Sequence, residues 1–382
     1  MLTPSSRQAD FPALAGMTYL NTAAEGIPPP AVGTALARYF HDKQMGMDGR
    51  LCHAAEHAEA RRLAAGLLGL APDDVAICSC SSEAFNLASL ALGLEAGDEV
   101  VVSDLDFPSS VTPWLQRSSP AEVKVWRSRA GRLDTADLVP LLSPRTRLVS
   151  LPLVSFYNGF RADVPAAAKV VHHHSPALLA VDVTQGLARI SLDLAGADLI
   201  VSSTHKWLLG SHGGGIVGVP PHRRAEWTVP AGGWFNIHDA FGQERFERAE
   251  SLTGAASFNV GMPNYPALYA IRAALDYITS IGVESIDRHA APLVANCLEG
   301  LLTLDARGAL GGELLSPRDP TALAGILAFR HPKAEALHGF LHDRGIHVMH
   351  HAGRLRIALH GYNTTADVET FLKSLAFALE KV

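Results

Sequence analysis

The chain has 382 residues, of which 48% are hydrophobic and 18% are charged, and this composition predicts a globular protein with a large core and two domains. Its formal net charge of −6 gives no reason to expect nucleic acid or an anionic membrane as a partner, and no apolar window has transmembrane length. The segment Met1–Arg7 lacks the basic and apolar regions of a signal peptide, so we expect a cytoplasmic protein.

Short apolar runs alternate with amphipathic helical patterns through the first two thirds of the chain. The helical patterns include Ala54–Leu70 and Glu83–Leu94. Strands separated by helices of this length indicate βαβ units and a mainly parallel sheet. The predicted strands are Val75–Cys78, Glu99–Ser103, Val123–Trp126, Leu148–Leu153, Leu178–Val183, Leu199–Ser202 and Gly215–Val219.

The remainder of the chain follows a different pattern. Gly218–Ala256 is rich in Gly, Pro and Trp and predicts a long irregular excursion that reaches a partner subunit, whereas Pro263–Ile281 predicts a long helix. The helices and strands predicted beyond it are Ala290–Leu302, Lys333–Arg344 and Thr365–Leu379, with Ala324–Phe329 and Leu355–Leu359. We therefore expect a large domain over residues 19–264 and a smaller α+β domain formed by residues 1–18 and 265–382.

The cysteines and histidines do not predict a metal site. Cys52, Cys78, Cys80 and Cys297 have the spacing of neither a zinc site nor a disulfide framework. The run His172–His174 follows an alanine-rich helical pattern and precedes a turn signal. We expect Cys78 and Cys80 to serve in packing, and no metal to be bound.

Five polar clusters follow predicted strands at their carboxyl ends. In a mainly parallel sheet these ends meet at one edge, where ligands bind. The convergence therefore predicts a binding site at that edge. The clusters are Ser79–Glu83, Asp104–Thr112, Ser155–Arg161, Asp182–Gln185 and Ser203–Lys206.

Lys206 lies between an apolar strand pattern and a glycine-rich tail. A lysine in such surroundings is either salt-bridged or chemically employed, because burial lowers its pKa and frees the amine as a nucleophile. Ser203–Lys206 also fits the S-x-x-K motif of serine-acylating enzymes, but the chain lacks their K-T-G motif. It also lacks the motifs of α/β-hydrolases, P-loop NTPases and Rossmann dehydrogenases.

Three other positions have both a functional and a structural interpretation. Ser81 and Ser82 precede a predicted helix and suit a phosphate, or Ser82 is only the N-cap of that helix. Asp182 ends an apolar strand and needs a partner, which is a protonated pyridine nitrogen, or else Asp182 caps a helix or pairs with an arginine such as Arg189. Phe107 stacks on a planar cofactor ring or belongs to the core.

Taken together, these residues resemble the class V aminotransferase family of pyridoxal-phosphate (PLP) enzymes. That family includes cysteine desulfurases, selenocysteine lyases and isopenicillin N epimerase-like proteins, and the similarity runs from Tyr19–Ala24 to Tyr362–Thr364. The resemblance implies the α/β fold type I of PLP-dependent transferases, which is aspartate aminotransferase-like. This fold has a mainly parallel seven-stranded sheet in a large domain and a smaller α+β domain, in a homodimer with active sites at its interface.

The resemblance also implies a role for each matching residue. Lys206, Asp182 and His205 are expected to be catalytic: Lys206 forms the Schiff base with PLP, and Asp182 pairs with the pyridine nitrogen. Arg356 is expected to bind the α-carboxylate of an amino-acid-like substrate, with Asn21 beside it. The cofactor-binding residues implied are Ser81, Ser82, Phe107, Asn158, Asp182, Gln185, Ser203, His205 and Lys206.

The chain departs from the family pattern at three places. Gly345–Leu355 contains no cysteine where a desulfurase carries the one that receives sulfur, so thiolate attack on a substrate sulfur is not expected. Met262 stands where the family has a threonine that donates to the phosphate of the partner's cofactor. Phe156 replaces an asparagine of the cofactor site, and we expect Asn158 or Ser155 to take its place.

We therefore expect a PLP-dependent enzyme that acts at Cα of an amino acid or amino-acid conjugate. An aminotransferase ranks first, a C–S β-lyase second, and an epimerase is a further alternative. All three reactions begin with removal of the Cα proton, so the motif residues do not separate them. A catalytically silent PLP-fold binding protein is the non-enzyme alternative, against which the intact Lys206, Asp182 and Gln185 argue.

Overall fold

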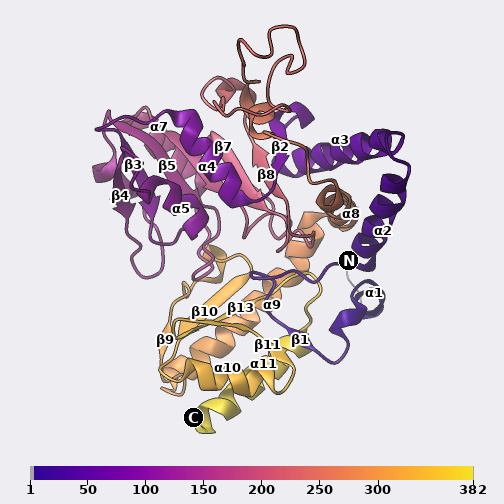
Figure 1. The fold of residues 1–382 in the computed structure, drawn as a ribbon. Coiled ribbons are helices and arrows are strands. Elements are labelled where there is room, and N and C mark those ends of the chain that lie inside the picture. The colour runs from indigo at the N-terminus through magenta and orange to yellow at the C-terminus, as the bar shows by residue number, and fades with distance from the viewer. Residues whose placement is uncertain (1–3, 382) are drawn as a thin grey trace.

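A seven-stranded sheet forms the centre of the computed structural model, which describes residues 4–381 (Figure 1). The strand order is β2-β8-β7-β6-β5-β3-β4, and every neighbouring pair is parallel except the two that involve β8. The expected mainly parallel sheet is therefore confirmed. Its strands are β2 (Val75–Cys78), β3 (Glu99–Ser103), β4 (Glu122–Trp126), β5 (Thr146–Pro152), β6 (Leu178–Asp182), β7 (Leu199–Ser203) and β8 (Gly215–Gly218).

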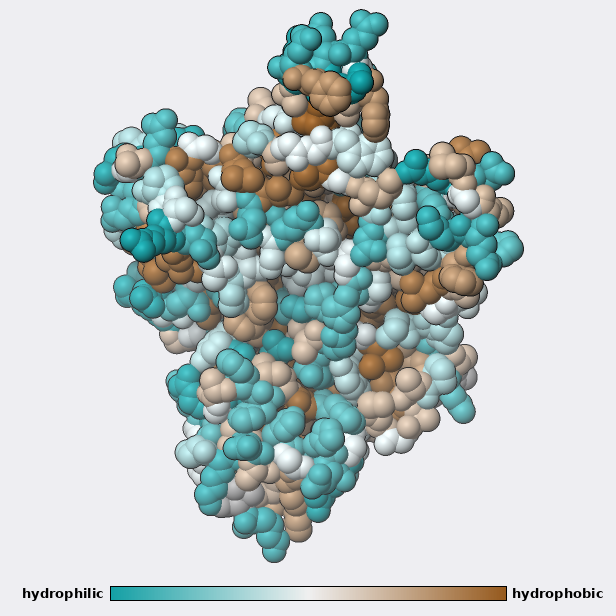
Figure 2. All heavy atoms as spheres, in the orientation of Figure 1, coloured by the Kyte–Doolittle hydropathy of each residue, from teal (hydrophilic) through white to brown (hydrophobic). Residues whose placement is uncertain are grey.

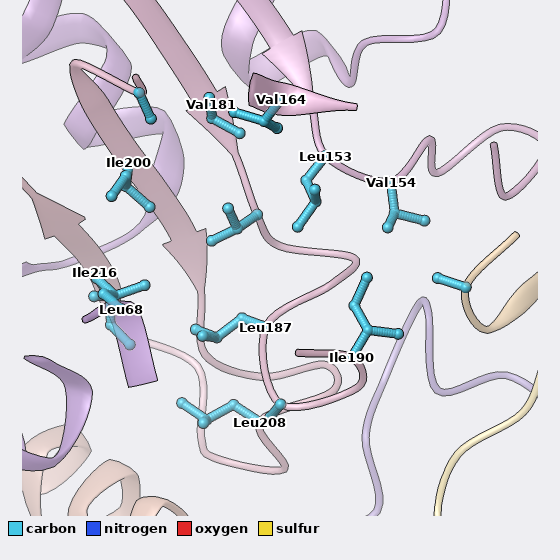
Figure 3. Close-up of a cluster of buried hydrophobic side chains, with 14 of the residues drawn as sticks. Leu68, Leu153, Val154, Val164, Val181, Leu187, Ile190, Ile200, Leu208 and Ile216 are labelled. Atoms are coloured by element: carbon cyan, nitrogen blue, oxygen red, sulfur yellow. The ribbon is translucent and has the colours of Figure 1, made fainter. Parts of the chain in front are cut away.

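Helices bury both faces of this sheet. Along β6, Leu179 and Val181 belong to one apolar cluster, and Leu178 and Ala180 belong to another, because successive side chains point to opposite faces. Figure 3 shows the first cluster, where Val181 and Ile200 from the sheet lie near helical residues. A sheet buried on both faces explains why its strands read as continuous apolar runs.

The apolar clusters on the two faces of the sheet include different helices. One face packs against α3 (Gly49–Leu68), α7 (Val164–His174) and α8 (Tyr265–Ile281), and the other against α4 (Ser81–Leu92) and α5 (Pro108–Leu115). The shorter helical segments are α1 (Pro4–Asp10), α6 (Thr135–Leu138), η1 (Pro12–Leu14), η2 (Pro72–Asp74), η3 (Val139–Leu141), η4 (Pro221–Arg223), η5 (Gly254–Phe258) and η6 (Pro320–Ala322).

The C-terminal part of the chain builds a second, α+β unit with its own core, below the large sheet in Figure 1. Its four-stranded antiparallel sheet has the order β12-β13-β10-β9, and a separate parallel pair joins β1 to β11. The elements of this unit are α9 (Val283–Ala306), α10 (Ala334–His342), α11 (Thr365–Lys381), β1 (Thr18–Tyr19), β9 (Glu313–Leu314), β10 (Ile326–Arg330), β11 (Ile346–His347), β12 (Met349–His351) and β13 (Arg354–Ala358).

Helix α8 packs against the large sheet. Leu268 and Ile271 of this helix join the core beneath that sheet, and Tyr269 packs with Val32 of α2 (Pro30–Gln44). The expected division at residue 264 stays a prediction. Sequence periodicity identified the helix but could not tell which core it covers.

The predicted excursion lies between β8 and α8 and is largely irregular apart from two short helical turns. In Figure 1 it projects from the top of the molecule. Its aromatic side chains Phe241 and Phe246 are 77% and 88% exposed, which is unusual for phenylalanine. Across residues 4–381, no helix combines the length and apolar character needed to cross a membrane.

The loop after β5 joins the two units through a close backbone approach at Gly159. This residue has φ +82°, and a Cβ added there would lie 2.0 Å from the carbonyl oxygen of Ile326 on β10. Nearby, the Arg161 N–H donates to the Ala322 carbonyl at 2.8 Å. Glycine is therefore required both by the left-handed backbone and by the space available.

We expect Gly159→Ala to lower the free energy of unfolding by about 1–3 kcal/mol, because the new methyl group collides with fixed backbone. Gly33→Ala in α2 is the matched control, since nothing lies within 4 Å of its added Cβ. Thermal and urea unfolding of both variants test this. Equal midpoints for the two variants would contradict the close approach.

Candidate active site

All five polar clusters contribute to one cavity at the carboxyl edge of the large sheet. This is the convergence expected of a mainly parallel sheet. The cavity combines hydroxyl, amide, carboxylate and amine groups with two phenylalanine rings, a mixture typical of a binding site for a polar aromatic ligand. Its lining residues are Ser81, Phe107, Ser109, Pro152, Val154, Phe156, Asp182, Thr184, Gln185, Ser203 and Lys206.

Lys206 lies in the turn after β7 and is 9% exposed. Burial lowers the pKa of its ammonium group from 10.5 to about 8, and the charge of Arg356 adds to this shift, whereas Asp182 opposes it. Its Nζ lies 4.9 Å from the centre of the Phe107 ring. A larger fraction of this amine is therefore neutral and nucleophilic near neutral pH than in an ordinary lysine, as its apolar setting in the sequence predicted.

A second chain segment fixes the backbone of this lysine. The Gly26 N–H donates to the His205 carbonyl at 2.9 Å, and a Cβ on Gly26 would lie 2.0 Å from the Lys206 carbonyl oxygen. Only glycine permits such an approach. The N-terminal segment therefore holds the Lys206 turn from outside the sheet.

Asp182 ends β6 and is 6% exposed. Its Oδ1 accepts a hydrogen bond from the Thr184 N–H at 2.8 Å. Burial raises the pKa of the Asp182 carboxyl, while hydrogen bonds from Thr184 and the charge of Lys206 lower it. Arg189, the alternative partner, forms an ion pair with Asp287 at 2.8 Å instead, so the expected pairing of Asp182 with this arginine is wrong. The hydrogen bond from the Thr184 N–H is of the capping kind that the structural interpretation also allowed.

Gln185 is held by hydrogen bonds at both ends of its amide. Its Nε2 donates to the Ala23 carbonyl at 3.1 Å, and its Oε1 accepts from Trp207 Nε1 at 2.5 Å. The Trp207 carbonyl in turn lies 2.7 Å from His360 Nε2. One amide hydrogen of Gln185 remains available to the cavity.

His360 is a neutral imidazole that holds Trp207 in place by donating a hydrogen bond to it. The Gly361 N–H donates to His360 Nδ1 at 2.6 Å, so Nε2 carries the ring hydrogen and donates to the Trp207 carbonyl. Burial lowers the pKa of His360 to about 3, which keeps the ring neutral. Neither Trp207 nor His360 was identified from the sequence, because neither belongs to a local motif.

Ser81 and Ser203 form a small hydroxyl pair beside the start of α4. Ser203 Oγ donates to Ser81 Oγ at 2.9 Å, and α4 begins at Ser81, so its free N–H groups lie there. Ser82 is exposed and lies outside the cavity lining. The N-cap is Cys80, whose Sγ accepts from the Glu83 N–H at 3.4 Å, so the interpretation of Ser82 as the cap is wrong.

His205 is half-buried and lies outside the cavity lining. Its ring stacks on His212 with centres 4.5 Å apart. Burial, together with the charges of Lys206 and His212, lowers the pKa of His205 to about 4. The imidazole is therefore neutral at physiological pH and can donate or accept a hydrogen bond.

The two phenylalanine rings form an apolar wall of the cavity. Phe107 and Phe156 meet edge to face, with centres 5.0 Å apart. Phe107 is 39% exposed, so its face is available to a planar ligand. Ser109, which sequence reasoning did not single out, lines the same cavity with a buried Oγ that lacks a hydrogen-bond partner.

Arg356 of the small unit and Asn21 of the N-terminal segment lie outside the cavity lining. Arg356 lies on β13, is 4% exposed, and its Nη1 donates to the Phe156 carbonyl at 3.0 Å. Its Nε and the Oδ1 of Asn21 are buried without partners. Burial lowers the pKa of Arg356 to about 9. Unsatisfied groups of this kind indicate a place that a ligand completes.

Asn158 does not face the cavity, which corrects the expectation for this residue. Its Nδ2 donates to the Gly131 carbonyl at 2.8 Å, and its Oδ1 accepts from the Phe160 N–H at 3.0 Å. Ser155, the other candidate, donates to the Leu105 carbonyl at 3.2 Å. Both side chains therefore stabilise the loop after β5 and do not bind a ligand, because the turn at residue 159 directs them away from the cavity.

Gly345–Leu355, the segment in which a desulfurase would carry its cysteine, contains a tight hairpin. β12 and β13 pair antiparallel and are joined at Ala352 and Gly353, which have φ values of 50° and 74°. Positive φ at both positions is the geometry of a two-residue hairpin turn. The cavity lining in the described chain includes no cysteine.

Comparisons with known proteins agree with this fold over nearly the whole chain. A "Probable cysteine desulfurase" of Pseudomonas putida is 29% identical, with 100% of this chain and 99% of that protein covered. The apo cysteine desulfurase of Thermococcus onnurineus has a TM-score of 0.88 at 23% identity, covering 100% of this chain and 99% of that one.

Two structures of the C–S lyase C-DES share the fold as well. One has glycine covalently linked to its PLP cofactor (TM-score 0.87, 20% identity, 97% of this chain and 98% of that one). The other, described as a complex of the cystine C–S lyase with cysteine persulfide, has a TM-score of 0.86 at 21% identity, covering 96% and 99%. The family profile Aminotransferase class-V matches residues 18–371, and the chain therefore belongs to the class V aminotransferase family.

Proposed function

We propose that this protein is a PLP-dependent enzyme that removes the Cα proton of an amino acid, and that it is an aminotransferase. One observation carries the proposal: Lys206, with its pKa lowered to about 8, shares a cavity with the buried Asp182 carboxylate and lies within the influence of the charge of Arg356, whose Nε is buried without a partner among the described residues. This is the arrangement that covalent amine chemistry on a carboxylate-bearing substrate requires.

The polar groups of the cavity fit the parts of PLP. Ser81, Ser203 and the start of α4 suit its phosphate, and Asp182 suits the protonated pyridine nitrogen. The free face of Phe107 suits the ring, and the remaining amide hydrogen of Gln185 suits the ring hydroxyl. When bound, PLP supplies an electron sink for negative charge at Cα.

Residues of this chain would bind the substrate, transfer the Cα proton and position the reacting groups. Arg356 would bind the α-carboxylate in a bidentate pair and fix the orientation of Cα. Lys206 Nζ, once free, would accept the Cα proton and return it, which its lowered pKa favours. The Asp182 carboxylate would hold a cationic partner in place, and the buried walls of the cavity would keep water out.

A C–S β-lyase is the second candidate. The names of the relatives favour it, because they include a probable cysteine desulfurase and a cystine C–S lyase. The absence of a cysteine in the β12–β13 hairpin argues against sulfur transfer to the protein but not against β-elimination. Incubation of the enzyme with amino acids would separate the candidates: keto acid formation with amino-group transfer supports transamination, and pyruvate with ammonia supports elimination.

We also propose a homodimer. Several large apolar side chains on α2, α3 and the segment between them are exposed, including Phe40 (64%), Met47 (72%) and Leu51 (80%), and Figure 2 shows apolar surface on this side. Exposed apolar groups of this size typically belong to an interface. A second copy of the chain, as the family implies, is the occupant we propose.

The first prediction concerns the lysine. Lys206→Ala should prevent borohydride from fixing PLP covalently to the protein and reduce turnover by about a thousandfold or more, since nucleophile and base are lost together. Lys169→Ala, at an exposed position of α7, is the control and should behave as the unchanged protein. Covalent attachment of PLP to Lys206→Ala after borohydride treatment would refute the assignment of this lysine.

The second prediction concerns pH. Because the pKa of Lys206 is about 8 rather than 10.5, the neutral amine is lost only as pH falls below 8. The rate at which PLP becomes attached to the apoenzyme should therefore rise about tenfold per pH unit below pH 8 and level off above it. Borohydride trapping followed by mass spectrometry measures the rate. Continued increase up to pH 10 would indicate an ordinary exposed lysine.

The third prediction concerns assembly. Sedimentation of the unchanged protein should give a dimer, and the double variant Phe40→Glu, Leu51→Glu should give monomers, because paired carboxylates cannot be buried at an apolar interface. Phe377→Glu on α11 offers a control at a similarly exposed phenylalanine outside this surface. A monomeric unchanged protein would overturn the proposed assembly.

A further inference from the structure

Two buried arginines lie side by side on β13, and neither has a carboxylate partner in the part of the chain that the structure describes. Arg354 and Arg356 are 3% and 4% exposed, and because they are two residues apart on one strand, their side chains leave the same face. Arg354 Nη1 donates to the Tyr157 carbonyl at 2.8 Å and Arg356 Nη1 to the Phe156 carbonyl at 3.0 Å. The Nε of each arginine is buried without a partner.

Other arginines in the molecule show how unusual this arrangement is. Arg189, which is also fully buried, is neutralised by Asp287 at 2.8 Å and donates to two carbonyl groups. Arg330, near Arg354, pairs with Glu313 at 2.9 Å. Within residues 4–381, the charged groups that act on Arg354 and Arg356 include no carboxylate. Buried cations without counter-ions are unfavourable, so two adjacent ones indicate that anions arrive from outside.

The two guanidinium groups differ in their distance from the reacting centre. The charge of Arg356 acts on Lys206, whereas that of Arg354 does not contribute appreciably. Arg354 lies 5.5 Å from the centre of the Phe156 ring and 4.2 Å from that of Tyr157. Phe156 lines the cavity, so Arg354 lies one aromatic ring away from it.

The spacing suits a ligand with two anionic ends. Residues two apart on a strand are separated by about 6.6 Å, which is enough for each guanidinium to bind its own carboxylate at opposite ends of a short carbon chain. A single carboxylate would satisfy Arg356 and leave Arg354 buried and unpaired. The β12–β13 hairpin therefore carries one binding group for the α-carboxylate and a second for a more distant anion.

We propose that the substrate is an amino acid with a second carboxylate on its side chain, of the size of glutamate, and that Arg354 binds this distal group. The assignment of the α-carboxylate to Arg356 rests on the proposed function, whereas the pairing of a dianion with the two arginines does not. Arg354 thereby becomes the residue that determines specificity.

Calorimetric titration with glutarate and with butyrate tests the arginine pair without any turnover. These probes have similar length and differ in the second carboxylate, and we expect glutarate to bind about tenfold or more tightly. Arg354→Gln should bring glutarate to the level of butyrate and leave butyrate unchanged, and Arg354→Lys should retain part of the preference. Thermal unfolding of both variants checks that they fold.

Equal binding of glutarate and butyrate by the unchanged protein, or a preference that survives in folded Arg354→Gln, would overturn the proposal. A matched pair of amino acids, L-glutamate and L-glutamine, then tests the substrate assignment through the change in visible absorbance of the holoenzyme. If glutarate is preferred but no amino acid changes the absorbance, the proposed function fails while the dianion site stands.

Discussion

The burial of one amine, that of Lys206, is the constraint on which the rest of the site depends. The lysine is placed where β7 ends, and its backbone is held from outside by Gly26, whose lack of a side chain permits contact with the Lys206 carbonyl. Trp207, directly after it, is fixed by Gln185 on one side and His360 on the other. The large sheet, the N-terminal segment and the small unit are therefore all needed to keep the amine in place and its pKa low.

The burial of Lys206 also affects the balance of charge in the cavity. The lining holds one cation, Lys206, and one carboxylate, Asp182, and the charge of Arg356 acts on Lys206 from outside the lining, so the site as a whole favours anionic ligands. A phosphate beside Ser81 and a carboxylate beside Arg356 would both reduce the repulsion among the buried cations. The β12–β13 hairpin, whose second strand supplies Arg356, contains no cysteine, and in our proposal it serves substrate binding.

Much of the fold could be predicted from the sequence because a sheet buried on both faces has continuous apolar strands, and all seven lie within a few residues of the expected bounds. The shared edge of the strands also brought the five polar clusters together. Asn158 was misplaced because its direction depends on the turn at Gly159, which forms only against β10. Trp207, His360 and Ser109 carry no local signal, since their roles arise from contacts between distant segments.

The central claim is that Lys206 transfers the Cα proton of an amino acid held by Arg356. The most direct measurement is hydrogen exchange at Cα, followed by mass spectrometry and NMR of L-glutamate incubated with the holoenzyme in D2O. The account predicts that deuterium enters at Cα, or that keto acid forms, with the unchanged protein but not with Lys206→Ala. Exchange at the same rate in both proteins, or no exchange with any amino acid that binds the holoenzyme, would contradict it.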